Sequence, residues 1–373
     1  GSEMCIRDSY QTALEIMQNK QSLGIKPGLS SIKSLLAKMG DPQEKIKIIH
    51  IAGTNGKGTV ANLISNGLVS CGLKTGLFTS PWVTDYREQI QLNGNFIPKE
   101  RFAYYVEQYY TEPATEFELL TAIMFRYFAD ENVDYAVVEC GMGGALDATN
   151  AFTRPEVAVI TSVSMDHTAF LGNTVKEIAA QKAGIIKDNS VCVLYPNPHC
   201  EEIFEERCKQ TGSRLIKIKQ QHDFRKNNLA VARECMAYLG QCAHLDYPVL
   251  PARQERFGNI LLDGAHNENG AHALADSLPL ENITAVIAMM ADKDCDSYLK
   301  IIAPRCRKII TTETSNPRTL AAKNLAEIAG RYCNCVSFEK DPHKALELAK
   351  RENMFTLVCG SFFLARDVRK DLI

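Results

Sequence analysis

The sequence predicts an α/β protein of two domains, each built on a mostly parallel sheet that is covered by helices. Three observations lead to this prediction. Apolar runs rich in β-branched residues alternate with segments of helical periodicity, a pattern typical of parallel sheets that are buried on both faces. The alternation stops in a proline-containing stretch at residues 240–253 and then starts again. The length of 373 residues also favours two domains over one.

The first domain is expected over residues 10–245. It begins with two short helices within residues 10–39, which the breaker sequence GIKPG separates. The stretch up to about Ser9 shows no pattern that continues into the first helix, so it is left out of the predicted fold. A last helix is predicted near residues 228–239. Five strands are predicted between these helices, in the runs KIKIIHIAG, KTGLFTS, DYAVVEC, EVAVITS and SVCVLYP.

The second domain is expected over residues 246–373, after an interdomain linker that contains two prolines. Its apolar runs are again separated by helical segments, which predicts a smaller, Rossmann-like α/β domain with a sheet of its own. The predicted strands are NILLDGAHN, ITAVIAMM, KIITTET and FTLVCG.

Composition excludes several classes of protein. The chain has 42 basic and 44 acidic residues, so it has no overall positive field to attract nucleic acid or an anionic membrane. No apolar run is long enough to span a bilayer. The 13 cysteines include no CxxC pair, which fits reduced thiols better than a disulfide framework. We therefore expect a soluble, cytoplasmic protein, and a monomer.

The strongest local motif is GTNGKGT, Gly53 to Thr59, between a predicted strand and a predicted helix. Glycines allow a tight turn that directs backbone N–H groups at an anion, Lys57 adds a positive charge, and the helix N-terminus adds a favourable dipole. The motif differs from a strict Walker A sequence at Ile51 and Gly58. It predicts a phosphate-binding loop and an ATPase domain of P-loop type, whereas the alternative is a glycine-rich turn without a ligand.

Three polar residues follow strands of the same predicted sheet. Ser80, Glu139 and His167 come at or after the ends of KTGLFT, DYAVVE and EVAVIT. The carboxyl ends of parallel strands meet at one edge, which is where ligands bind in open α/β sheets. These side chains could hold Mg²⁺ against nucleotide phosphates, although each residue taken alone is commonplace.

At this level of detail the chain resembles the folylpolyglutamate synthase/dihydrofolate synthase family of the Mur ligase superfamily, from residue 24 to the end. The resemblance implies an ATP-dependent ligase that adds L-glutamate to a folate or dihydropteroate carboxylate through an acyl phosphate, with a C-terminal glutamate-ligase domain. The matching blocks are HIAGTNGKGT, GLFTSP, TEFELLTA, VVECGMGG and LDATN on either side of Ala145, AVITSVSMDHTAFLGNTVKEIA, QKAGIIK, LLDGAHN, MMADKD, NPR and CGS.

The resemblance also implies roles for individual residues. Lys57, His167 and Lys182 would be catalytic, with Lys182 carried as a carbamate, and Ser80, Glu139 and His167 would bind Mg²⁺. The implied ATP contacts are Asn55, Gly56, Lys57, Gly58, Thr59, Asn228, Arg253, Asp263 and His266. The implied contacts to the folate-type substrate are Thr115, Glu116, Phe117, Glu118, Leu146, Asp147 and Ala148, with Trp82 as a further candidate.

Several of these residues have a plainer interpretation. Arg253 could be a solvated linker charge, Asp263 a helix cap, and the register that favours Asn228 over Asn227 is open by one residue. The TEFE sequence that starts at Thr115 could be a capping box, alone or in addition to a substrate contact. On sequence alone, Lys182 would be an ordinary solvated lysine.

The chain also departs from the family pattern. Ala145 stands where the family usually has arginine, and Trp82 replaces a histidine, so it could stack on a pterin or cover an apolar edge. QKAG replaces EKAG, and the segment at 224–228 is shortened. The open alternatives for function are another Mur-type amino-acid ligase, a P-loop nucleotide-binding protein, or a paralogue with degraded ligase activity.

Overall fold

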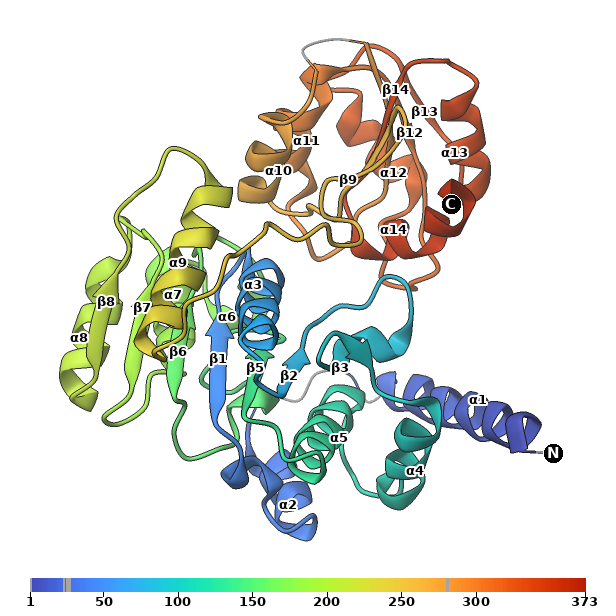
Figure 1. Ribbon diagram of the computed structural model, residues 1–373. Coiled ribbons are helices and arrows are strands. Elements are labelled where there is room, and N and C mark those ends of the chain that lie inside the picture. Colours follow the sequence, from blue (N-terminus) through green and yellow to red (C-terminus); the bar gives the residue numbers. More distant parts are fainter. Residues whose placement is uncertain (1, 23, 25–27, 280–281) are drawn as a thin grey trace. The chain divides into compact units, whose positions relative to one another are not determined.

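The computed structural model describes residues 2–22, 24, 28–279 and 282–373 (Figure 1). The chain divides into two compact units. The first unit consists of Gly1–Ser80, Arg87–Val163 and Leu171–Pro248, and the second of Pro81–Tyr86, Ser164–Phe170 and Val249–Ile373. Two short segments from the first half of the chain therefore pack with the second unit.

The first unit is built on an eight-stranded sheet with the order β4-β3-β2-β5-β1-β6-β7-β8. The six strands from β2 to β8 pair in parallel, and β3 and β4 extend the edge as an antiparallel hairpin. The five strands predicted for this domain are confirmed. The strands are β1 (Ile48–Ala52), β2 (Thr75–Phe78), β3 (Ile90–Leu92), β4 (Asn95–Phe96), β5 (Tyr135–Glu139), β6 (Val157–Ile160), β7 (Val191–Leu194) and β8 (Arg214–Lys217).

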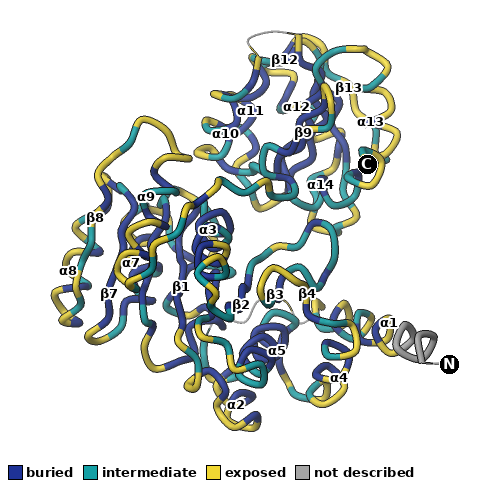
Figure 2. The backbone as a smooth tube through the Cα atoms, in the orientation of Figure 1, coloured by how far each residue is buried: buried dark blue, intermediate teal, exposed yellow. Residues whose placement is uncertain are grey.

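Side chains alternate between the two faces of this sheet, as the two-residue period of a strand requires. In β6, Val157 and Val159 face a core that includes residues of α3 and α9, whereas Ala158 and Ile160 face a core that includes residues of α7 and α8. Burial on both faces explains why these strands read as continuous apolar runs, and Figure 2 shows the central strands as buried along their length.

Helices of the first unit surround this sheet, and their bounds follow. They are α1 (Ser2–Gln21), α2 (Ser30–Lys38), α3 (Lys57–Ser70), α4 (Lys99–Tyr109), α5 (Glu116–Asp130), α7 (Val175–Ala183), α8 (Glu201–Thr211) and α9 (Phe224–Tyr238). A short helix α6 (Thr168–Leu171) spans the boundary between the units, and 3-10 helices occur at Pro42–Lys45, Tyr86–Gln89 and Ala148–Asn150.

The helices that follow β1 and β6 pack on opposite faces of the sheet. The helix α3, which follows β1, belongs to one core, and α7, which follows the neighbouring strand β6, belongs to the other. In open α/β sheets such a reversal marks the edge where ligands bind, beyond the carboxyl ends of the strands. The loop that leaves β1 therefore occupies a position suited to a ligand.

The second unit has a six-stranded sheet with the order β13-β12-β11-β14-β10-β9, parallel except for the pair β9 and β10. The four strands predicted here are confirmed, and β9 and β13 are additional short edge strands. The strands are β9 (Glu255–Phe257), β10 (Ile260–Leu262), β11 (Ile283–Ile287), β12 (Cys306–Thr311), β13 (Val336–Phe338) and β14 (Phe355–Cys359). The helices are α10 (Glu268–Ala275), α11 (Cys295–Ile302), α12 (Ala322–Ala329), α13 (Pro342–Lys350) and α14 (Phe362–Val368), with 3-10 turns at Ala303–Arg305 and Arg369–Leu372.

One sequence prediction fails at the N-terminus. The first helix starts at Ser2 and not near the expected start at Tyr10, so most of the stretch that was left out of the predicted fold belongs to α1. Hydrophobic periodicity did not reveal this, because a helix needs an apolar stripe only where it packs against a core.

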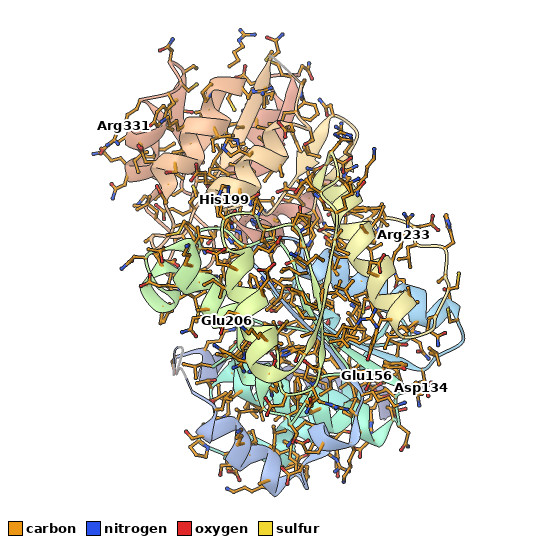
Figure 3. All side chains as sticks on the ribbon, turned by 90° about the vertical axis from the view of Figure 1, so that its left-hand side faces the viewer. Asp134, Glu156, His199, Glu206, Arg233 and Arg331 are labelled. Atoms are coloured by element: carbon orange, nitrogen blue, oxygen red, sulfur yellow. The ribbon has the colours of Figure 1, made fainter. Side chains whose placement is uncertain are left out.

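Charged side chains such as those of Glu206 in α8, Arg233 in α9 and Arg331 are exposed at the surface (Figure 3). The cysteines whose side chains are described are free thiols, and most of them are buried. Within the described ranges, no helix has the length and apolar character needed to cross a membrane.

Candidate active site

The loop between β1 and α3 has a conformation that depends on two of its glycines. Gly53 has φ of 156° and Gly56, which precedes α3, has φ of 86°, values that L-residues rarely adopt. A Cβ at Gly53 would lie 1.8 Å from Thr161 Oγ1, and one at Gly56 would lie 2.9 Å from Asn228 Oδ1. Any larger residue would displace these neighbours, so the loop keeps close contact with β6 and α9.

Hydrogen bonds from two other elements hold the same loop in place. The backbone N–H of Thr54 donates to the carbonyl of Ser162 at 2.7 Å, and the Ser162 hydroxyl donates to the carbonyl of Asn55 at 3.2 Å. Lys182 of α7 donates from Nζ to the carbonyl of Gly53 at 2.9 Å. The side chain of Lys182 is buried, so the plainer interpretation of a solvated lysine is wrong.

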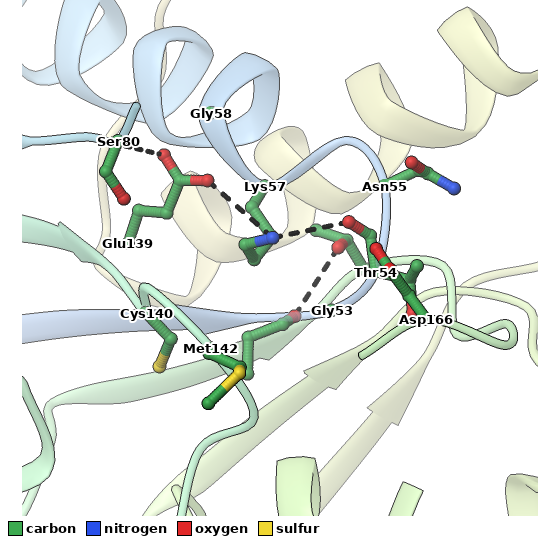
Figure 4. Close-up of polar contacts among 12 residues, drawn as sticks. Gly53, Thr54, Asn55, Lys57, Gly58, Ser80, Glu139, Cys140, Met142 and Asp166 are labelled. Atoms are coloured by element: carbon green, nitrogen blue, oxygen red, sulfur yellow. Dashed lines mark hydrogen bonds and ion pairs between the residues drawn. The ribbon is translucent and has the colours of Figure 1, made fainter. Parts of the chain in front are cut away.

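Three sequence-predicted residues meet at the carboxyl end of β5 (Figure 4). Glu139, its last residue, is 2% exposed, and its Oε1 lies 3.8 Å from Lys57 Nζ. The Ser80 backbone N–H donates to the other carboxylate oxygen of Glu139 at 3.2 Å. Lys57 also donates to the carbonyl of Thr54 at 3.3 Å. A buried carboxylate, a hydroxyl-bearing residue and a lysine thus lie beside the phosphate-type loop.

The oxygen donors at this edge fit a hard divalent cation. Mg²⁺ is usually bound through one or two protein oxygen ligands, with water and substrate phosphates completing the coordination. Glu139 and Ser80 offer a carboxylate and a hydroxyl of that kind. Groups of three or more His, Cys, Asp or Glu arranged for a metal are not found in the described ranges. His167, the third predicted ligand, has φ of 49° and lies in the segment 164–170 that packs with the second unit.

The loop after β5 is shaped by Asp147. Its buried carboxylate accepts hydrogen bonds from the backbone N–H groups of Met142 at 2.7 Å and Thr149 at 3.0 Å. Burial raises the pKa of Asp147, while these hydrogen bonds oppose the rise. Leu146 is half exposed at the tip of the loop, and Ala148 is buried. Asp147 therefore organises the loop from within, and Leu146 is the residue presented at its surface.

The TEFE sequence forms the start of α5. Thr115 and Glu118 make a complete capping box, in which the Glu118 carboxylate accepts from the Thr115 N–H at 2.8 Å. Between them, Phe117 covers the glycine that begins the Asp147 loop, because a Cβ at Gly141 would lie 2.5 Å from the Phe117 ring. Glu116 is only partly exposed. The capping interpretation is confirmed, and the same turn also packs against the loop after β5.

Asn228, and not Asn227, contacts the phosphate-type loop. Its amide abuts Gly56 and donates to the Tyr247 hydroxyl at 3.3 Å. Asn227 is used elsewhere, since its Oδ1 accepts from the Gln221 N–H. Of the two asparagines between which the sequence left the choice open, Asn228 is the one that lies beside the loop.

In the second unit, Asp263 and its neighbours form a second polar site. The Asp263 carboxylate accepts from the N–H groups of Gln254 at 2.8 Å and Ala265 at 2.7 Å, and burial raises its pKa. The helix cap is Asn267 instead, so the cap interpretation of Asp263 is wrong. The Arg253 guanidinium lies 4.9 Å from the centre of the Phe362 ring, which gives it a packing partner that a solvated linker charge would lack.

His266 is linked to a charged cluster that the sequence analysis missed. Its Nδ1 lies 2.8 Å from the Gly264 carbonyl, and its Nε2 lies 3.7 Å from Asp166. Asp166 also forms a 2.5 Å ion pair with Lys293, and both side chains are less than a tenth exposed. Burial alone raises the pKa of Asp166, but His266, His167 and Lys293 outweigh it and hold the pKa well below its usual range.

Asp166 and Lys293 stand 127 positions apart in the chain. Asp166 lies in the motif SMDHT and Lys293 in the motif MMADKD, both of which match the family. Neither motif indicates which acidic residue pairs with which lysine. Only the possibility of a charge pair between an acidic residue of the first motif and a lysine of the second could have suggested the contact.

Comparison with known proteins identifies the family. The Mur ligase middle domain model matches residues 51–250, and the Mur ligase, glutamate ligase domain model matches residues 252–362. The chain is 31% identical to the dihydrofolate synthase/folylpolyglutamate synthase of Bacillus subtilis strain 168, over 98% of this chain and 99% of that protein. The chain belongs to the folylpolyglutamate synthase/dihydrofolate synthase family. It is accordingly an ATP-dependent ligase of the Mur ligase superfamily.

Solved structures of family members have the same fold. The Mycobacterium tuberculosis folylpolyglutamate synthase, in structures with ADP and AMPPCP, is 26% identical with a TM-score of 0.87, covering 98% of this chain and 99% of that chain. The bifunctional folylpolyglutamate synthase/dihydrofolate synthase of Yersinia pestis, complexed with AMPPNP and a Mn ion, is 25% identical with a TM-score of 0.85, covering 97% and 98%. The predicted class, a P-loop-type domain followed by a smaller Rossmann-like domain, is confirmed.

Proposed function

We propose that this ligase joins L-glutamate to the carboxylate of a folate or dihydropteroate, using ATP to form an acyl phosphate. The observation that supports this most directly is the loop Gly53–Thr59 with Lys57 beside the buried Glu139, in a chain that matches a dihydrofolate synthase/folylpolyglutamate synthase over nearly its whole length. A carboxylate is a poor acceptor for an amine until it is activated. Phosphorylation by ATP creates a leaving group, the glutamate amine attacks the acyl carbon, and phosphate departs.

The phosphate loop is the proposed ATP site. Its backbone N–H groups and the N-terminus of α3 would bind the phosphates, and Lys57 would neutralise the charge of the transferred phosphoryl group. Such catalysis consists mainly of positioning and of electrostatic stabilisation by groups already in place. The proposed ATP contacts remain Asn55, Gly56, Lys57, Gly58 and Thr59, with Asn228, Arg253, Asp263 and His266.

Ser80, Glu139 and His167 are the proposed ligands of a divalent ion, and Mg²⁺ suits their oxygen-rich chemistry. A divalent ion bound there would offset the negative charge of the phosphates. Glu139 contributes the charge, and its contacts with Lys57 and the Ser80 N–H hold its carboxylate in a fixed orientation. That orientation would restrict a phosphate to one side of the carboxylate.

The folate-type substrate is proposed to lie against Thr115–Glu118 and Leu146–Ala148. Phe117 of the first segment packs against Gly141, which lies at the start of the loop that carries Leu146–Ala148, so both segments belong to the same region of the first unit. Leu146 offers exposed apolar area, and Asp147 keeps the loop in shape. Because alanine stands at position 145, this loop lacks the cation that an arginine would supply. The loop is also tightly packed here, since a Cβ at Gly184 would lie only 2.3 Å from Ala145 Cβ.

Lys182 is proposed to act as a carbamate. A carbamate keeps one hydrogen on Nζ, so it is compatible with the hydrogen bond to the Gly53 carbonyl. Its two oxygens would form an anionic ligand group for a second cation beside the acyl phosphate. The alternative is an unmodified amine that only anchors the phosphate loop.

The roles of the domains complete the proposal. Residues 10–245 would form the ATP-binding domain and residues 246–373 the glutamate-ligase domain, and the protein would act as a monomer. Closure of the two would exclude water from the acyl phosphate, which hydrolyses readily.

The test is ADP release by the purified protein with dihydropteroate or tetrahydrofolate, with and without L-glutamate. We expect ADP release that requires glutamate and one of the two pterin substrates, with a product heavier by one glutamate. ADP release without glutamate, or with other amino acids in preference, would favour a nucleotide hydrolase or another Mur-type ligase.

A further inference from the structure

The segment Pro81–Tyr86 follows the predicted metal ligand Ser80 directly, and it packs with the second unit. Val83 is 5% exposed and belongs to an apolar core of that unit, which also contains Leu262 and Val358. The segment thus packs with the second unit and inserts Val83 into the core of that unit.

One side chain holds this segment at two points. Arg366 of α14 places its guanidinium carbon 3.5 Å from the centre of the Trp82 ring. It also donates to the Trp82 carbonyl, from Nη2 at 2.8 Å and from Nε at 3.3 Å. The planar fork of arginine suits this combination, since it can stack on an aromatic face while its edge binds a carbonyl. Lysine could satisfy only part of the arrangement.

The position of Trp82 connects this contact with the candidate metal site. Only Pro81 separates Ser80 from Trp82, and consecutive Cα atoms are about 3.8 Å apart, so the position of Trp82 restricts where the Ser80 backbone can lie. On its other side, the Ser80 N–H is bonded to the Glu139 carboxylate. Ser80 is therefore bonded to Glu139 through its N–H and joined by a peptide bond to Pro81, the first residue of the anchored segment.

We propose that Arg366 is a positioning residue for metal binding, which fixes Pro81–Tyr86 and thereby the orientation of Ser80. Trp82 is in this proposal an anchor, because Arg366 covers one face of its ring. The anchored residue affects the metal site through the backbone that leads to Ser80, and it does not stack on a pterin. The inference rests on the proposed function for the role of Ser80, but the anchor itself does not depend on that role.

The experiment uses three variants of the full chain. Arg366→Met keeps the apolar stem and removes both contacts, Arg366→Lys keeps the charge and one donor group, and Lys370→Met is the control, because Lys370 is exposed near the same helix. Trp82 is the only tryptophan, so fluorescence reports this segment alone. Circular dichroism verifies folding, and Arg366→Lys allows the test should the methionine variant not fold.

In the ligand-free protein, we expect acrylamide to quench Trp82 more strongly in Arg366→Met than in the wild type, with Arg366→Lys between them. The Mg²⁺ concentration for half-maximal ADP release should rise several-fold, and at most about 30-fold, the factor equivalent to losing one well-formed cation–π contact. Saturating Mg²⁺ shifts the variant toward the conformation in which Pro81–Tyr86 is ordered, because that conformation binds the ion. The kcat value should therefore stay near that of the wild type. Lys370→Met should match the wild type in both measurements.

Two results would overturn the proposal. Unchanged quenching in Arg366→Met would mean that the anchor does not hold Trp82. Increased quenching with an unchanged Mg²⁺ requirement would mean that the segment does not position Ser80. A wild-type protein without glutamate-dependent ADP release would instead refute the proposed function, and in that case the quenching still decides whether the anchor exists.

Discussion

Replacing Lys57 by methionine tests the central pair of the candidate active site. Methionine keeps most of the apolar stem but removes the positive charge 3.8 Å from the buried Glu139 carboxylate. Lys74→Met is a matched control in the same unit. Lys74 pairs with Glu131 at the shorter distance of 3.1 Å, but their side chains are 38% and 30% exposed, against 17% and 2% for Lys57 and Glu139.

Burial, and not distance, should decide the size of the effect. At 3.8 Å two unit charges interact by about 4 kcal/mol with an effective dielectric constant near 20. Breaking a buried pair usually costs about 3–5 kcal/mol, and because Lys57 is partly solvated we expect a loss of about 2–4 kcal/mol. The exposed pair of Lys74 should lose no more than about 1 kcal/mol. Lys57→Met should also lower kcat by at least about 10²–10³-fold, the usual effect of removing one charge-stabilising donor.

Urea unfolding followed by circular dichroism measures the free energies, and ADP release measures turnover. The variant should still fold, because domains of this kind retain about 5–15 kcal/mol of stability. Near-normal ADP production in Lys57→Met would show that the loop is not the phosphate site. A loss of stability equal to that of Lys74→Met would show that the Lys57–Glu139 pair is exposed to solvent in solution.

Three further predictions concern the same unit. Gly56→Ala should destabilise the protein more than Gly72→Ala in urea unfolding. Both glycines have positive φ, which costs alanine about 1–2 kcal/mol, but only at Gly56 would the new Cβ also lie 2.9 Å from an amide oxygen. Equal losses of stability in the two variants would refute this contact. Burial, and secondarily a nearby lysine, lowers the pKa of His50, so below about pH 6.5 the unfolded chain binds a proton that the folded chain does not. The free energy of unfolding should therefore fall as the pH drops below about 6.5, by up to about 1.4 kcal/mol per unit, and His50→Gln should flatten this slope whereas a change at the exposed His199 should not. Lys182→Ala should keep ATP binding and lose most ligation, with partial recovery in formate or acetate; full activity without an additive would exclude the carbamate.

The buried network around His50 shows where sequence reasoning stopped. The ring lies in β1, with Nε2 2.8 Å from the Thr149 hydroxyl and 3.1 Å from the Cys140 sulfur. In the sequence His50 is a single polar residue within an apolar run, and no neighbouring residue indicates its hydrogen-bond partner. Cys140 directly follows β5, the neighbouring strand in the sheet, and Thr149 lies in the loop that Asp147 organises, so the contact arises only when β1 and β5 pair.

The sequence by itself determined the central strands of the two sheets and the position of the glycine-rich loop after β1, because these depend on local patterns. Alternation and apolar runs report burial along one strand, and glycines report a tight turn wherever they stand. The capping box at Thr115 is a further example, since both of its partners lie within four residues.

Only the tertiary structure decided which distant side chains meet. It paired Lys57 with Glu139, Asp166 with Lys293, and Arg366 with Trp82, and it buried Lys182, which a helical pattern alone would leave in solvent. The physical reason is that a charge or a ring can be satisfied by many partners of equal chemistry. The choice among them is made by the packing of sheets and helices, which brings together residues that no local pattern relates.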